Sequence, residues 1–143
     1  MPIAPFPHRY IVNLENDQLH ALPRETIAIG PPPQFGGTDG VWSPEELLAG
    51  AAVSCLKTTF DAYARRDKLV FRDWSASATL VLEKAASGPR VSEITIHVSF
   101  SVDEGREEDA RRILATTERQ CIISRALTCP VNIELTLRER SAA

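Results

Sequence analysis

Apolar and polar side chains alternate along three stretches of this 143-residue chain, residues 73–83, 91–102 and 131–137. Alternation with a period of two predicts half-buried β-strands. The turn sequence Ser87-Gly88-Pro89 separates the first two stretches, so we expect them to pair as a long antiparallel hairpin. The inward-facing side chains should be Trp74, Ala76, Ala78, Leu80 and Leu82 in the first strand and Ile94, Ile96, Val98, Phe100 and Val102 in the second.

A long helix is predicted from Pro44 to about residue 68, because its start carries several signals. Ser43 can act as the N-cap, Pro44 fits the first helical position, and Glu46 can complete a capping box. Residues 47–56 are apolar or small on every side of this helix. A helix without a polar face is expected to be buried on all sides.

The N-terminal region predicts three short strands, at residues 9–14, 18–22 and 25–29, in a meander. Residues 30–40 are rich in proline and glycine, so they should form neither helix nor strand. This stretch contains neither a Walker lysine nor a dinucleotide-binding fingerprint. We therefore interpret it as a structural loop.

A second helix at residues 107–120 and a short helical turn at 122–127 precede the last strand. The order of elements is then three strands, helix, two strands, helix, strand. This order predicts an α+β fold in which the long helix packs on a curved antiparallel sheet. The length of the chain fits one domain, residues 1–143.

Composition and charge exclude several classes of function. A formal charge of −3 provides no electrostatic footprint for nucleic acid. No apolar run approaches the roughly 20 residues that span a membrane, and the N-terminus is a poor signal peptide, so a cytoplasmic protein is expected. The three cysteines do not have the Cys-x-x-Cys spacing of common zinc sites. A redox pair with one spare cysteine remains possible.

Two motifs resemble those of the OsmC/Ohr family, the osmotically inducible and organic-hydroperoxide-resistance proteins. The first is Ser43-Pro44-Glu45-Glu46-Leu47-Leu48, followed by small residues and Ser54-Cys55. The second is Cys121-Ile122-Ile123-Ser124-Arg125-Ala126-Leu127. The resemblance implies an intertwined homodimer and a thiol-dependent peroxidase that reduces organic hydroperoxides to alcohols, with no cofactor. Dithiols or lipoyl proteins are the reductants that it implies.

The resemblance also implies a role for each site residue. Cys55 would be the peroxidatic nucleophile and Cys121 the resolving thiol, which captures the Cys55 sulfenic acid as a disulfide. Burial raises the pKa of a thiol, and the start of the helix is three turns from Cys55, so a cation should stabilise the thiolate. In the family an arginine does this, held by a glutamate that corresponds to Glu45. The amides of the turn that follows Cys121 should favour ionisation of Cys121.

The arginine itself has three candidates. Arg24 is slightly preferred, and Arg9 and Arg125 remain alternatives. Ten residues separate Glu45 from Cys55, which corresponds to about 15 Å along a helix. Glu45 therefore cannot serve the Cys55 of its own chain, but it could serve that of a second copy in a two-fold dimer.

Cys129 is a competing candidate for the resolving thiol, because Cys129-Pro130-Val131 imitates the Cys-Pro-Val wording that is usual in the family. It precedes a strand, however, and not a helical turn. We therefore assign the resolving role to Cys121 and interpret Cys129 as a core residue.

The apolar residues near the helix, Phe35, Trp42, Leu56 and Phe60, should favour an organic hydroperoxide over hydrogen peroxide. Two other functions remain open. The first is a non-enzymatic, stress-related protein that binds a small molecule in an apolar interface pocket. The second is a thioesterase of the hot-dog fold, in which a long helix is also wrapped by an antiparallel sheet.

Overall fold

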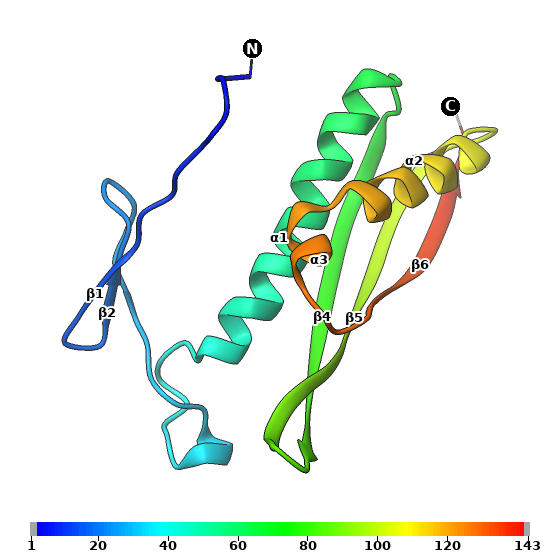
Figure 1. Ribbon diagram of the computed structural model, residues 1–143. Helices are drawn as coiled ribbons and strands as arrows, with labels where there is room; N and C mark the ends of the chain where they lie inside the picture. The colour runs from blue at the N-terminus through cyan, green and yellow to red at the C-terminus, as the bar shows by residue number, and fades with distance from the viewer. Residues whose placement is uncertain (1–2, 142–143) are drawn as a thin grey trace. The chain divides into compact units, whose positions relative to one another are not determined.

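The computed structural model describes residues 3–141 (Figure 1). The chain divides between Leu47 and Leu48 into two compact units, and each is described by itself. Whether residues 1–143 form one domain stays a prediction.

The N-terminal unit contains a small antiparallel sheet in the order β1-β2-β3, which confirms the predicted meander. Its elements are β1 (Asn13–Glu15), β2 (Gln18–His20), β3 (Ile27–Ala28) and the 3₁₀ turn η1 (Pro33–Phe35). The strands are shorter than predicted, and η1 corrects the expectation that residues 30–40 hold no helical turn. Asn16 and Asp17 have positive φ angles of 49° and 60°, which suits a two-residue hairpin turn between β1 and β2.

The long helix α1 (Pro44–Arg66) begins at the predicted residue and ends two residues before the predicted end. The capping box is present. The Glu46 backbone N–H donates to Ser43 Oγ at 3.1 Å, and the Ser43 N–H donates to Glu46 Oε1 at 3.1 Å. Within residues 3–141, no helix has both the length and the apolar character needed to span a membrane.

The second unit is built on a sheet in the order β4-β5-β6. Its elements are β4 (Phe71–Ala85), β5 (Gly88–Asp103), α2 (Glu107–Gln120), α3 (Ile122–Ala126) and β6 (Val131–Arg140). The predicted hairpin is confirmed, because β4 and β5 pair antiparallel. The expectation of a wholly antiparallel sheet is wrong, since β6 pairs parallel to β5. The reason is the crossover through α2 and α3, which returns the chain to the end of the sheet where β5 began.

Helices α1 and α2 lie over one face of this sheet, and the core fills the space between them (Figure 1). All five inward residues predicted in β5 are buried: Ile94, Ile96, Val98, Phe100 and Val102. In β4 the prediction fails at Leu82, which is 37% exposed. A break in the register between Val81 and Leu82 shifts the alternation there.

The burial of α1 is one-sided within a single chain. Ala52, Leu56, Phe60 and Ala64 form its buried stripe, while Val53 and Cys55 are half-buried. The expectation of burial on all sides is therefore not met by one chain. The physical reason is that the sheet and α2 cover one side of the helix.

Candidate functional site

Two thiols meet in the second unit. Cys55 is half-buried in the middle of α1, and Cys121 is fully buried where α2 ends and α3 begins. Although 66 residues separate them in the sequence, the two thiols lie close enough for each to shift the pKa of the other. The fold thus brings together the two cysteines that the sequence motifs single out.

Neutral donors surround the Cys55 sulfur. Burial opposes the ionisation of this thiol, but hydrogen bonds from the Ile123 and Ile122 backbone N–H groups and from the Cys121 and Thr59 side chains outweigh burial. The pKa of Cys55 consequently lies below its ordinary value. The hydroxyl Oγ1 of Thr59, one helical turn after Cys55 on α1, is 4.0 Å from Cys55 Sγ.

The Cys121 sulfur has the opposite balance. Burial raises its pKa, and the neighbouring Cys55 thiol raises it further, so that the hydrogen bonds from Ser124 do not compensate. Ser124 Oγ donates to Cys121 Sγ at 3.4 Å. One amide of the following turn, that of Ser124, favours the Cys121 anion as expected, but burial and the Cys55 thiol outweigh it and the pKa is raised. The amides of Ile122 and Ile123 are directed to Cys55, and Ser124 alone stabilises the Cys121 anion.

The three candidate arginines are all exposed. Arg125 lies on α3, whereas Arg9 and Arg24 belong to the N-terminal unit. The groups that lower the pKa of Cys55 are neutral and lie within residues 48–143. The choice of arginine stays a prediction.

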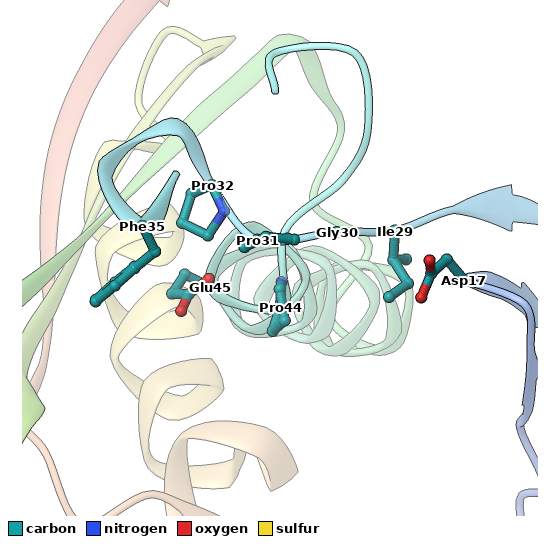
Figure 2. Close-up of a pocket in the computed structure, with 8 residues that line it drawn as sticks. All are labelled: Asp17, Ile29, Gly30, Pro31, Pro32, Phe35, Pro44 and Glu45. Atoms are coloured by element: carbon teal, nitrogen blue, oxygen red, sulfur yellow. The ribbon is translucent and has the colours of Figure 1, made fainter. Parts of the chain in front are cut away.

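Glu45 lies in the N-terminal unit, at the edge of a pocket of about 370 Å³ (Figure 2). The pocket is lined by Asp17, Ile29, Gly30, Pro31, Pro32, Phe35, Pro44 and Glu45. Glu45 Oε2 is buried and has no hydrogen-bond partner within residues 3–141. A buried carboxylate oxygen without a partner is unfavourable, so this atom is suited to accept from a donor supplied to the pocket.

The wall of this pocket depends on a glycine. A Cβ atom on Gly37 would lie 1.7 Å from the carbonyl oxygen of Pro31, so any other residue would displace the loop. The Gly37 N–H donates to the Pro32 carbonyl at 3.1 Å. These contacts fit the interpretation of this stretch as a structural loop.

Cys129 packs against the hydrophobic core of the second unit, just before β6. Two of the four side chains expected near a substrate are in the core, since Leu56 and Phe60 are 1% and 0% exposed. Phe35 and Trp42 are 54% and 50% exposed. Only the latter two have surface available for a ligand.

Sequence analysis assigned no role in the site to Thr59 or Ser124, whose polar groups contact the two sulfurs. In each case the spacing from the cysteine could have indicated the contact. Thr59 follows Cys55 by four residues, and Ser124 follows Cys121 by three, which are the spacings that place side chains on one face of a helix. The contribution of the Ile122 and Ile123 amides depends on backbone geometry, which no residue pattern reveals.

The structure thus combines an α+β fold, in which a long helix packs on a mixed sheet, with two neighbouring thiols. These features can be compared with those of known protein families. Residues 37–136 match the family described as OsmC-like protein. This chain belongs to the OsmC-like family. No curated protein sequence matches it significantly.

Solved structures share this fold at low sequence identity. An OsmC-like protein of unknown function from Vibrio cholerae has a TM-score of 0.78 and 15% identity, with 92% of this chain and 99% of that chain covered. An organic hydroperoxide resistance protein OsmC from Legionella pneumophila has a TM-score of 0.66 and 17% identity, with 95% and 99% covered. The organic hydroperoxide resistance protein OhrB of Bacillus subtilis has a TM-score of 0.59 and 18% identity, with 93% and 98% covered. These similarities establish the fold.

Proposed function

We propose that this protein is a thiol-dependent peroxidase that reduces organic hydroperoxides to alcohols, with Cys55 as the peroxidatic and Cys121 as the resolving thiol. The observation that carries the proposal is the proximity of these two thiols, each of which shifts the pKa of the other. The family provides further support, because some of its structural neighbours are described as organic hydroperoxide resistance proteins.

The first step is attack of the Cys55 thiolate on the terminal oxygen of the hydroperoxide. The O–O bond breaks, the alkoxide takes a proton and leaves as the alcohol, and Cys55 becomes a sulfenic acid. The lowered pKa of Cys55 supports this role, since the thiolate is the nucleophile.

The second step is attack of Cys121 on the Cys55 sulfenic acid. An S–S bond forms, the S–O bond breaks, and the hydroxyl leaves as water with the proton that Cys121 loses. A dithiol or lipoyl protein then reduces the disulfide by thiol–disulfide exchange and is itself oxidised to a disulfide. The cytoplasm, where thiols are kept reduced, is the compartment that suits this cycle.

Glu45 orients an activating arginine in this proposal, with Arg24 preferred. The buried Oε2 of Glu45, which has no hydrogen-bond partner in the described part of the chain, supports a cation as its partner, because a guanidinium would supply the missing donors. Ten residues of the continuous helix α1 separate Glu45 from Cys55, which is about 15 Å. The arginine held by Glu45 therefore acts on the Cys55 of a second copy.

A homodimer is the assembly that this arrangement requires. Large apolar side chains are exposed throughout the N-terminal segment, as expected if a second copy covers them. They are Ile3 at 80%, Phe6 at 78%, Tyr10 at 87%, Ile11 at 75%, Val12 at 56%, Leu14 at 57% and Leu22 at 81%. The one-sided burial of α1 supports the same assembly.

A steady-state assay with a dithiol reductant tests the function. We expect faster turnover of cumene hydroperoxide than of hydrogen peroxide, because the exposed rings of Phe35 and Trp42 offer apolar contact to the organic group. C55S should abolish turnover, and C129S is the matched control that should retain it. Equal rates for the two peroxides, or an active C55S variant, would contradict the proposal.

A further inference from the structure

We propose that Ser124 is a catalytic residue of the resolving step, in which its hydroxyl donates a hydrogen bond to the Cys121 sulfur as that sulfur attacks the Cys55 sulfenic acid. This inference rests on the proposed function and assigns one more residue to the same site. It starts from a direct contact, since Ser124 Oγ lies 3.4 Å from Cys121 Sγ.

The turn of α3 holds Ser124 in place at this sulfur. The Arg125 N–H donates to the Cys121 carbonyl at 3.1 Å, and the Leu127 N–H donates to the Ser124 carbonyl at 3.3 Å. Ser124 is half-buried, and its backbone N–H, like its hydroxyl, acts to lower the pKa of Cys121. Backbone hydrogen bonds on either side of Ser124 in the sequence thus hold its hydroxyl near the sulfur. No conformational change is needed to bring it there during the reaction.

The resolving step creates a need for such a donor. Cys121 has no exposed surface, so water cannot solvate its sulfur in this chain. As the thiol loses its proton, negative charge develops on a buried atom, and a hydrogen bond to it becomes stronger. Both groups that favour the Cys121 anion, the hydroxyl and the backbone N–H, belong to Ser124.

The atoms of the step balance with Ser124 unchanged. The Cys121 thiol gives up its proton, the Cys121–Cys55 S–S bond forms, the S–O bond of the sulfenic acid breaks, and the proton and hydroxyl leave as water. The Ser124 hydroxyl keeps its own hydrogen throughout. Its contribution is to stabilise the charge on the attacking sulfur.

The donors at the two sulfurs are separate, and this makes the proposal specific. Cys55 receives hydrogen bonds from the Ile122 and Ile123 amides and from Thr59, whereas the Ser124 hydroxyl bonds to Cys121. Loss of the Ser124 hydroxyl should therefore slow disulfide formation and leave the oxidation of Cys55 unchanged.

The test compares wild type, S124A and S124T after rapid mixing of the reduced proteins with one equivalent of cumene hydroperoxide. Dimedone trapping measures the sulfenic acid, and alkylation of the remaining thiols measures the disulfide. For S124A we expect an unchanged rate of Cys55 oxidation and about tenfold slower disulfide formation, the effect of one hydrogen bond to a charged acceptor. S124T, which keeps the hydroxyl, should restore most of the rate. The control is T116A, which removes an exposed hydroxyl on α2 that bonds to the Arg112 carbonyl.

Disulfide formation in S124A at the wild-type rate would overturn this assignment alone. So would an equal slowing of both steps, which would indicate a structural role, or an S124T variant as slow as S124A. A wild-type protein that forms no Cys55–Cys121 disulfide would overturn the proposed function as well.

Discussion

The thiols of Cys55 and Cys121 lie close enough to influence each other, and their pKa values are shifted in opposite directions. Burial raises the pKa of both thiols, but at Cys55 it is outweighed by the Ile122 and Ile123 amides and the Cys121 and Thr59 side chains, whereas at Cys121 the Ser124 groups do not outweigh it. The more acidic thiol is the one that attacks first in the proposed cycle. The less acidic thiol remains protonated until the sulfenic acid has formed.

Replacing Thr59 by valine should raise the pKa of Cys55, because it removes a hydroxyl that stabilises the thiolate. At a pH below that pKa the thiolate fraction falls, so oxidation by hydroperoxide should slow by about fivefold, the effect of one long hydrogen bond with an Oγ1–Sγ distance of 4.0 Å. Alkylation rates of Cys55 measured across pH report the shift. T58V is the matched control, since the Thr58 hydroxyl bonds to the Cys55 carbonyl and not to its sulfur. A T59V profile that coincides with wild type would refute the prediction.

Asp67 should stabilise the fold in a defined pH window. Its contacts with Arg66 and Arg112 lower its pKa to about 2. A depressed carboxyl pKa contributes stability above the unfolded value of about 3.9, and this contribution is lost as the pH falls toward 2. In the D67N variant the free energy of unfolding, measured by denaturation at a series of pH values, should therefore fall less steeply between pH values of about 3.9 and 2. E104Q, which removes an exposed carboxylate elsewhere, should keep the wild-type slope.

Phe60 should be the most sensitive position in the core of the second unit. It is fully buried and lies 5.1 Å from Phe71, 4.7 Å from Trp74 and 5.1 Å from Phe100, measured between ring centroids. F60A should lower the free energy of unfolding by about 3–5 kcal/mol, through lost burial and the cavity left behind. Urea titration measures this loss. V70A, at a position that is 53% exposed, should change stability by less than about 0.5 kcal/mol, and an equal effect of both variants would contradict the core assignment.

Mixing of inactive subunits tests whether Glu45 serves a second copy. C55S and E45Q chains should each be nearly inactive alone. In a mixed dimer the intact Glu45 of the C55S chain meets the intact Cys55 of the E45Q chain, so one of the two sites is complete. After exchange of equal amounts about half of the dimers are mixed, so about a quarter of wild-type activity should be recovered. The wild type itself should have twice the 15.8 kDa mass of the chain in solution. If dimers that are shown to be mixed recover no activity, Glu45 and Cys55 of different chains do not share a site.

The periodic parts of the chain were predictable because their patterns directly reflect burial. The capping signals at Ser43 and Glu46 placed the start of α1, and the alternation from Ile94 to Val102 identified the buried face of β5. The parallel pairing of β6 was not predictable in this way, since alternation does not encode strand direction. Leu82 was predicted to face the core, but the break in register between Val81 and Leu82 turns its side chain to the other face of the sheet. Such a bulge leaves the alternation of apolar and polar residues in the sequence unchanged.

At the candidate site the sequence motifs indicated the two cysteines but not their electrostatics. The acidity of Cys55 depends on the backbone N–H groups of Ile122 and Ile123, which every non-proline residue carries. Their direction follows from the way in which the chain turns between α2 and α3. Of the amides in the turn that was expected to serve Cys121, only that of Ser124 does so, and those of Ile122 and Ile123 act on Cys55.

Peptide mapping by mass spectrometry after one equivalent of organic hydroperoxide identifies the partner of Cys55 in the oxidised protein. If Cys121 is the resolving thiol, the oxidised protein contains a disulfide between Cys55 and Cys121, and Cys129 is recovered as a free thiol. A bridge from Cys55 to Cys129, or stable over-oxidation of Cys55 with Cys121 still reduced, would contradict this role of Cys121.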